Sequence, residues 1–227
     1  MSKKIDYVTV GDIQTNCWFY CLEDEGSGQK PCAVIDPGDE AEVILSRLKE
    51  LNWVPRYILL THGHFDHLAA LPDLYAAFEK TNSGSVPEIG VHRLDACYLG
   101  KDSLKAHRDS FSTAGGNPAY VNALWKPMPD ADLLFEEGGA IGPFKIIHVP
   151  GHTPGSIAFY DEKNGVLFSG DTLFRGNWGR TDLPGVNEAE IFQSLKRLLS
   201  MKGETVVCPG HGPATTIQGE TQLLQYL

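Results

Sequence analysis

The sequence predicts an α/β fold, because apolar runs typical of buried strands alternate with segments whose apolar residues follow helical spacing. Residues 57–60 and 205–208 are two such runs, and residues 41–51 are one of the amphipathic segments. A chain of 227 residues without a linker or low-complexity tract is long enough to bury one sizeable core. We therefore expect a single domain that spans residues 1–227.

The N-terminal half is expected to begin with strands and then to alternate strands with helices. Its predicted strands are 5–10, 16–22, 32–35, 55–60 and 88–91. The first helix is expected to have Asp39 as its N-cap and Glu42 three residues later, which is the spacing of a capping box. A second helix is predicted over about residues 72–80, because Pro72 is tolerated in a first helical turn.

The C-terminal half repeats this organisation. Its predicted strands are 144–149, 157–160, 165–169 and 205–208. A helix over 188–200 has Asn187 as its expected cap, and a final amphipathic helix covers about 217–226. Residues 81–130 are less regular, and we expect them to form a lid or a wall beside a substrate. His92 and His107 in that segment are isolated, so they are interpreted as structural or surface histidines.

Composition narrows the classes of function. The apolar share of 42% argues against disorder, and no window approaches the ~20 apolar residues of a membrane span. A net charge of −10 without a Lys/Arg cluster disfavours nucleic-acid binding. No apolar segment follows the charged start, so no secretory signal is expected. Five cysteines without a C-x-x-C pair indicate reduced thiols and a cytoplasmic protein.

A cluster of metal-capable side chains follows the strand predicted at residues 55–60. The segment Thr61-His62-Gly63-His64-Phe65-Asp66-His67 places three imidazoles and one carboxylate within six residues. Packing these groups together without a cation would cost desolvation and, once an imidazole is protonated, repulsion. Such ligands suit zinc, iron or manganese. Two adjacent ions would use all four side chains as ligands, whereas one ion would leave some of them unbound. The alternative to a metal site is a polar loop whose histidines are solvated.

Three further predicted strands end at a candidate ligand. These are His152 after 144–149, Asp171 after 165–169 and His211 after 205–208. Loops at one end of a sheet are where α/β proteins place binding residues, and a glycine beside each ligand permits a close backbone approach. Each motif alone is weak evidence for a metal ligand, but the combination of these motifs with the histidine segment indicates one metal centre. Asp36, at the end of another strand, is expected to fix a ligand imidazole.

On these residues the sequence resembles the metallo-β-lactamase superfamily, whose signature is Thr-His-x-His-x-Asp-His. The resemblance extends over nearly the whole chain, through Thr15-Asn16, 34–38, 151–156, 170–174 and 209–213 in the superfamily order. The fold that it implies is the four-layer αβ/βα sandwich: two mixed sheets lie face to face, with helices outside and metal ions at one edge.

The resemblance also implies the ligand set by position. One metal ion would be bound by His62, His64 and His152, the other by Asp66, His67 and His211, and Asp171 would bridge them. The implied cofactor is two divalent metal ions, with zinc expected and iron or manganese as alternatives.

Within the superfamily, 170–174 and 179–185 look most like the glyoxalase II group, particularly its short bacterial members. The loop reads His-Gly-His-Phe-Asp-His rather than the triple-His form of typical glyoxalase II. The chain also ends soon after His211, so the helical region that holds glutathione in the longer enzymes is expected to be missing. Arg180 occupies the position of a basic substrate-binding residue, and a salt bridge to Asp182 is its alternative role.

The implied function is that of a metal-dependent hydrolase, a thioesterase acting on small S-lactoylglutathione-like thioesters through a metal-bridging hydroxide. Asp66 would be the catalytic group that orients the hydroxide and shuttles its proton. One alternative is a mononuclear iron persulfide dioxygenase that uses His62, His152 and Asp171. Another alternative is a non-enzymatic metal-binding protein. The sequence does not predict the oligomeric state.

Overall fold

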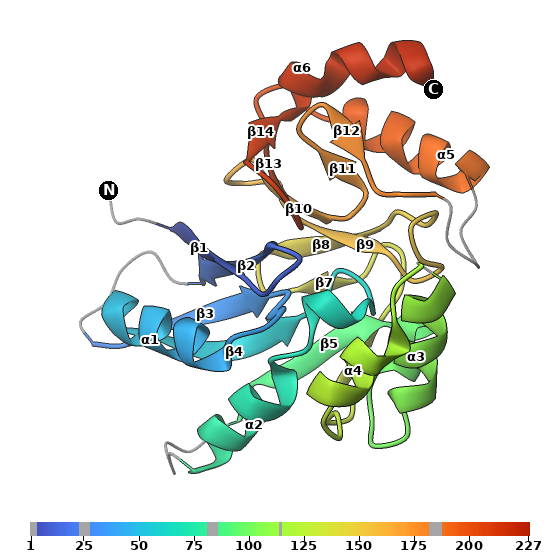
Figure 1. Ribbon diagram of the computed structural model, residues 1–227. Coiled ribbons are helices and arrows are strands. Elements are labelled where there is room, and N and C mark those ends of the chain that lie inside the picture. The colour runs from blue at the N-terminus through green and yellow to red at the C-terminus, as the bar shows by residue number, and fades with distance from the viewer. Residues whose placement is uncertain (1–3, 23–27, 81–85, 114, 182–187) are drawn as a thin grey trace.

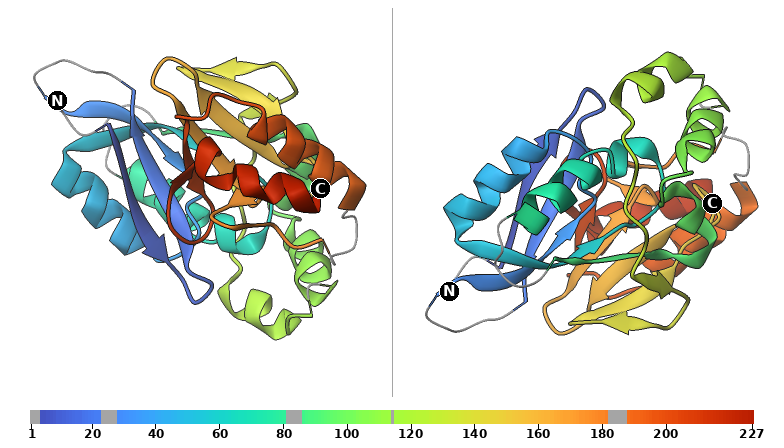
Figure 2. Two further views of the ribbon diagram at one scale, coloured as in Figure 1. Left: turned by 90° about the horizontal axis from the view of Figure 1, so that it is seen from above. Right: turned by 90° about the horizontal axis from the view of Figure 1, so that it is seen from below.

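The computed structural model describes residues 4–22, 28–80, 86–113, 115–181 and 188–227. Two six-stranded mixed sheets pack face to face, and helices cover the outer face of each sheet (Figure 1). Figure 2 shows the resulting order of helix, sheet, sheet and helix from two further sides. The four-layer sandwich of mixed sheets expected from the sequence is confirmed.

The first sheet comes from the N-terminal half. Its strands lie in chain order: β1 (Ile5–Val10), β2 (Thr15–Cys21), β3 (Lys30–Ile35), β4 (Trp53–Leu59), β5 (Glu88–His92) and β6 (Leu133–Phe135). β1 pairs antiparallel with β2, and β2 pairs antiparallel with β3. From β3 to β6, each strand pairs in parallel with the next. The helices α1 (Ala41–Leu51) and α2 (Leu71–Lys80) bury Ile44, Leu48, Leu71 and Leu74 against the outer face of this sheet.

The second sheet comes from the C-terminal half. Its order is β14 (Thr215–Thr216), β13 (Val206–Pro209), β10 (Val166–Gly170), β9 (Ile157–Asp161), β8 (Phe144–His148) and β7 (Ala140–Ile141). Only β10 and β13 pair in parallel. Its outer face is covered by α5 (Glu188–Leu199), α6 (Ile217–Glu220) and the 3-10 helix η3 (Thr221–Tyr226). A short ribbon of β11 (Leu173–Phe174) and β12 (Asn177–Trp178) follows β10.

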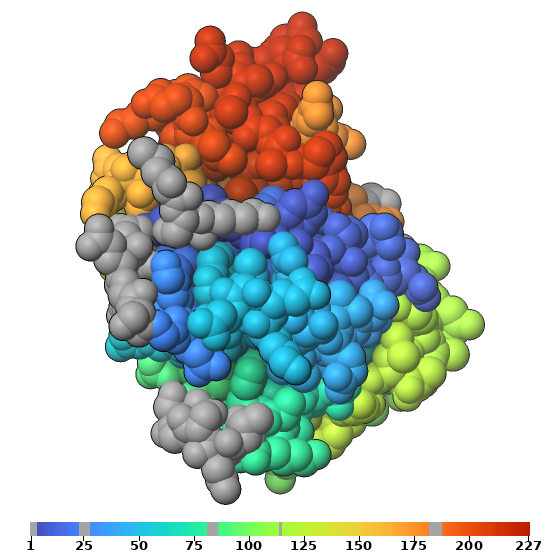
Figure 3. Space-filling view, turned by 90° about the vertical axis from the view of Figure 1, so that its left-hand side faces the viewer, coloured from blue at the N-terminus to red at the C-terminus, as the bar shows by residue number. Residues whose placement is uncertain are grey.

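An aromatic core joins the two sheets. Tyr20 of β2 packs against Phe144 of β8 with ring centroids 4.9 Å apart, and against Phe168 of β10 at 5.9 Å. All seven residues of β2 are buried, which explains why its sequence is almost continuously apolar instead of alternating. The two halves also share hydrogen bonds, since Asn16 N donates to Gly210 O at 2.7 Å. Figure 3 shows the C-terminal segment packed directly on the N-terminal strands.

The capping box predicted for the first helix is wrong. The N-cap of α1 is Glu40, in the left-handed conformation at φ 51°, and no side chain caps the helix. Asp39 accepts the Glu40 N–H, while Glu40 Oε2 accepts the Gly11 N–H at 2.8 Å. The way in which the chain enters α1 is therefore set by a contact with the β1–β2 turn. The local sequence around α1 does not encode this contact. The expected cap Asn187 lies outside the described residues, and the predicted last helix divides into α6 and η3.

Residues 86–130 form short helices that lie at one end of the sandwich. After β5 come the 3-10 helix η2 (Arg93–Tyr98), then α3 (Leu104–Thr113) and α4 (Pro118–Leu124). Figures 1 and 2 show α3 and α4 beside the loops that follow the strands. None of the described helices is both long enough and apolar enough to cross a bilayer.

Candidate metal centre

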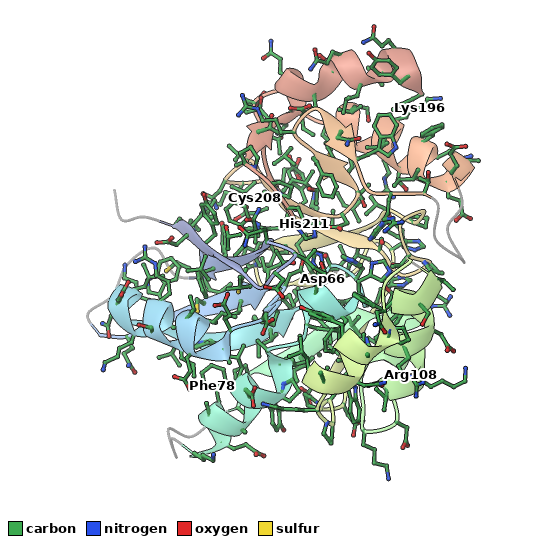
Figure 4. The ribbon with its side chains drawn as sticks, in the orientation of Figure 1. Asp66, Phe78, Arg108, Lys196, Cys208 and His211 are labelled. Carbon is green, nitrogen blue, oxygen red and sulfur yellow. The ribbon has the colours of Figure 1, made fainter. Side chains whose placement is uncertain are left out.

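Four strand ends meet at one edge of the sandwich. The loop after β4 carries His62 and His64 and continues into the 3-10 helix η1 (Phe65–His67), while β8, β10 and β13 lead to the other predicted ligands. Figure 4 shows Asp66 and His211 together between the two sheets, although they come from opposite halves of the chain. All seven predicted metal-binding side chains are therefore brought into one cluster.

The first group in this cluster is made of three imidazoles. The ligand nitrogens of His62, His64 and His152 lie within 4.8 Å of one another. The ring of His152 is 4.9 Å from that of His62 and 4.5 Å from that of His64, centroid to centroid. Three nitrogens facing one point form an open tripod that leaves room for a further ligand.

The second group contains a carboxylate and two imidazoles. Ligand atoms of Asp66, His67 and His211 also lie within 4.8 Å of one another. The Nε2 atoms of His67 and His211 are 3.2 Å apart, and Asp66 Oδ2 is 3.3 Å from His211 Nε2. Asp171 lies between the two groups, with Oδ1 3.3 Å from His67 Nε2 and Oδ2 3.6 Å from His152 Nε2.

The histidine rings are held so that Nε2 faces the cluster. Nδ1 of His67 is 3.1 Å from Asp36 Oδ2, and Nδ1 of His211 is 3.3 Å from Gln14 O. His152 Nδ1 likewise lies 3.3 Å from Arg180 O. A proton on each Nδ1 leaves the Nε2 lone pair available to a metal ion.

These residues fit metal ions. In the described part of the chain, His62 Nε2, His152 Nε2 and Asp171 Oδ1 are buried polar atoms without a hydrogen-bond partner. Buried polar atoms without partners are rare, because each loses its hydration without compensation. Cations held by the groups of ligand atoms in this cluster would satisfy these atoms, and the nitrogen and oxygen donor set suits zinc, iron or manganese.

Two kinds of histidine environment occur in the metal-free cluster. Burial lowers the pKa of His64 to about 3 and also lowers the pKa of His62 and His152, so these imidazoles are neutral as a metal ion requires. Burial acts in the same direction on His67 and His211, but the neighbouring carboxylates outweigh it. Asp171 and Asp66 raise the pKa of His211 to about 10 and that of His67 well above its ordinary value.

The stability of the metal-free protein is expected to be highest near pH 6.5, the ordinary pKa of histidine. His211, with its folded pKa of about 10, contributes stability that is fully present below pH 6.5 and is lost as the pH rises through 10. His64 acts at the other end, because stability falls as the pH drops from 6.5 towards its folded pKa of about 3. Urea unfolding of chelator-treated protein at about pH 5, 6.5 and 9 measures this curve. A stability that climbs steadily above pH 6.5 would contradict it.

Asp36 supports the second group, as expected from the sequence. Its side chain is buried, with Oδ1 accepting the Thr61 N–H at 2.8 Å and Oδ2 accepting the Thr61 hydroxyl at 2.7 Å. The same Oδ2 is the atom that faces His67 Nδ1. One carboxylate therefore fixes both the start of the histidine loop and the orientation of a candidate ligand.

A cavity of about 550 Å³ opens beside the cluster. Asp66 and Asp171 border it, and Arg180 lies on its wall. Its apolar side chains come from several segments of the chain: Ile13, Phe65, Phe111, Phe174 and Trp178. The expectation that residues 81–130 contribute a wall is confirmed by four lining residues: His107, Ser110, Phe111 and Gly116.

Some residues at the site were not anticipated. Asp95 of η2 is fully buried and contacts both of the loops that carry the first group of histidines. Its segment has no regular pattern, so only its contacts with Gly63, Thr153 and Gly155, between 32 and 60 residues away in the chain, reveal it. His148, within β8, does not reach the cluster: its Nε2 lies 2.9 Å from Pro154 O and its ring stacks on His92.

Comparison with known proteins agrees with this geometry. Residues 10–211 match the family model described as the metallo-beta-lactamase superfamily. The chain belongs to the metallo-beta-lactamase superfamily. It is therefore a member of a family of metallo-hydrolases, and its His/Asp cluster is the metal site of that fold.

Three similar proteins have names that state an activity or a bound metal. The hydroxyacylglutathione hydrolase GloC of Haemophilus influenzae is 33% identical over 224 residues, which are 98% of this chain and 97% of the relative. A crystal structure of TTHA1623 in a di-iron-bound form shares 37% identity with a TM-score of 0.76 and covers 98% of this chain and 100% of its own. The structure of the B3 metallo-beta-lactamase BLEG-1 shares 32% identity with the same TM-score and covers 96% of both chains.

Proposed function

We propose that this protein is a thioesterase that hydrolyses small hydroxyacyl thioesters of the S-lactoylglutathione kind, using two metal ions. The observation that carries the proposal is the completeness of both ligand groups beside a cavity with an arginine on its wall. The full-length similarity to a hydroxyacylglutathione hydrolase supports the substrate class. Zinc is the proposed ion, and the di-iron form of a similar protein makes iron the alternative.

When bound, the metal ions would supply an acidified water and polarise the thioester carbonyl. The first group would hold one ion through His62, His64 and His152, and the second would hold the other through Asp66, His67 and His211. Asp171, between them, would contact both. The imidazoles of His62, His64 and His152 bring no positive charge of their own, which leaves the electrophilic character at the first group to the ion.

Asp66 is the proposed proton acceptor. Its Oδ2 accepts the Thr15 hydroxyl at 3.2 Å, which fixes the carboxylate at the cavity border. Burial raises its pKa, but His67 and His211 outweigh burial and hold the pKa of Asp66 below its ordinary value. The group is therefore ionised at neutral pH and can orient a water as a hydrogen-bond acceptor, and the acidified water would supply the proton that it shuttles. A thiol leaving group with a pKa of ~8.5 needs little protonation as it departs.

The competing reading is a dioxygenase with a single iron. It needs only His62, His152 and Asp171 or a close variant, so it gives no role to the second group, whose three ligand atoms also lie within 4.8 Å of one another. That complete second group favours the hydrolase. The two readings differ in metal content and in the co-reactant that they consume.

The test is to measure metal content and three reactions on one preparation. We expect two metal ions per chain, hydrolysis of S-lactoylglutathione, no oxygen consumption with glutathione persulfide and no cleavage of a β-lactam. One iron per chain with persulfide-dependent oxygen uptake would overturn the proposal. Two metal ions with β-lactam cleavage alone would reject the substrate class while keeping the hydrolytic centre.

Replacing Arg180 should affect binding more than chemistry. We expect Arg180→Ala to raise the KM for a carboxylate-bearing thioester about three- to tenfold, with kcat little changed, because an exposed cation adds modest attraction. A neutral thioester should show no such change. Arg175→Ala is the matched control, since Arg175 is also exposed but is not among the cavity-lining residues. Equal losses for charged and neutral thioesters would reject the assigned role.

A further inference from the structure

Asp95 joins the two loops that supply the first group of histidines. Its Oδ2 accepts the Gly63 N–H at 2.9 Å and the Thr153 hydroxyl at 2.7 Å, while its Oδ1 accepts the Gly155 N–H at 2.8 Å. The residue has 0% of its surface exposed. Three hydrogen bonds to a fully buried carboxylate fix the donors tightly, because no water can replace any of them.

The loops approach η2 as closely as a backbone allows. A Cβ atom at Gly155 would lie 2.4 Å from Asp95 Oδ1, and one at Gly63 would lie 1.9 Å from the Tyr98 ring. Any side chain at these positions would push its loop away from η2. The two glycines are thus explained by contact with η2 rather than by the metal ligands beside them.

Each contact of Asp95 is adjacent to a candidate ligand. Gly63 lies between His62 and His64, and Thr153 directly follows His152. The three imidazoles come from loops separated by about ninety residues, so their relative position depends on what connects those loops. Asp95 makes that connection through both of its oxygens. Asp36 is the carboxylate that faces His67 of the second group, and it also accepts the Thr61 hydroxyl, which lies 3.1 Å from His62 Nδ1.

We propose that Asp95 is a positioning residue that sets the metal affinity of the site formed by His62, His64 and His152, and leaves the site of Asp66, His67 and His211 nearly unchanged. This inference rests on the two-metal centre of the proposed function. The Asp95 carboxylate binds the two loops of the first site, whereas Asp36 faces His67 directly and reaches His62 through the Thr61 hydroxyl. Losing Asp95 should therefore weaken one half of the centre selectively.

The principal test is Asp95→Asn in the full chain. The amide keeps the size of the side chain, but its NH2 group must face at least one of the three donors. Titration of the metal-free protein with Co²⁺ against a competing chelator, followed by the visible absorption of bound cobalt, resolves the two sites. We expect one site to weaken about 10–100-fold while the other stays within a few-fold of wild type, as for other residues that orient metal ligands.

Thr153→Val is a milder second variant, because it preserves the side-chain shape and both backbone hydrogen bonds to Asp95, and removes the hydroxyl contacts with Asp95 and Ser156. The same site should weaken by several-fold. Asp161→Asn is the matched control: Asp161 is also buried and hydrogen-bonded, to Tyr20 and Asn164, but far from the cluster. It should lower the melting temperature without changing either cobalt affinity.

The outcomes are decisive in both directions. Equal weakening of both sites, no weakening, or the same weakening in the Asp161→Asn control would overturn the role of Asp95. Failure of the wild-type protein to take up two cobalt ions would instead reject the two-metal centre. The wild-type titration therefore separates failure of the proposed function from failure of this inference.

Discussion

An Asp171→Asn variant is expected to lose thioester hydrolysis by more than about a hundredfold, beyond the 10–100-fold typical of groups that only orient ligands. Asp171 has one oxygen near each group of histidines: Oδ1 is 3.3 Å from His67 Nε2 and Oδ2 is 3.6 Å from His152 Nε2. An amide keeps the shape but removes the charge that would neutralise two cations. Steady-state kinetics with S-lactoylglutathione and metal analysis of the same sample give the measurement.

Asp132→Asn is the control for this change. Asp132 accepts a hydrogen bond from Ile89 N at 2.8 Å and is remote from the cluster, so its variant loses a carboxylate that only supports β5. It should retain wild-type kcat and two metal ions. If Asp171→Asn kept full activity with two bound ions, the proposed bridging role would be wrong.

Asp36→Asn is expected to weaken metal binding at the second group about 10–100-fold and to lower the free energy of unfolding by about 1–3 kcal/mol. The reason is that Asp36 is almost fully buried and accepts two hydrogen bonds from Thr61 while it faces His67 Nδ1. An amide can present a donor to the Thr61 pair or to His67, but every such orientation leaves one buried group unsatisfied. Chelator-competed cobalt titration and urea unfolding measure the two effects.

The Asp36 and Asp95 variants differ in which site they weaken most. Asp36→Asn should weaken the site of Asp66, His67 and His211 most, with a smaller effect on the other site through Thr61 and His62, whereas Asp95→Asn should weaken the site of His62, His64 and His152. A cobalt titration in which Asp36→Asn emptied that first site and spared the second would contradict the assignment of carboxylates to sites.

The positions of the candidate ligands could be predicted because they follow local signals. Each apolar run that forms β4, β8, β10 or β13 ends in a polar, glycine-containing motif, and strand ends gather at one edge of a sheet. The histidine loop is specific by itself, since three imidazoles and a carboxylate lie within six residues. Long apolar strands and strong helix periodicity predicted an α/β fold from local signals as well, whereas the arrangement in two facing sheets was implied by the resemblance to the superfamily.

What could not be predicted depends on contacts between distant segments. Glu40 enters α1 with a left-handed backbone because it binds the turn at Gly11, twenty-nine residues earlier. Asp95 is identified only by loops thirty-two and sixty residues away. The aromatic wall of the cavity likewise takes Phe65, Phe111 and Trp178 from three separate segments. The periodicity of the sequence does not encode such contacts between distant segments, so only the folded structure reveals them.

The central claim is that seven side chains hold two metal ions at one edge of the sandwich. Anomalous diffraction from crystals of the zinc-loaded protein tests it most directly. The account predicts two peaks ~3.5–4 Å apart, one against His62, His64 and His152 and the other against Asp66, His67 and His211, with Asp171 touching both. A single peak, or peaks that these residues do not contact, would contradict it.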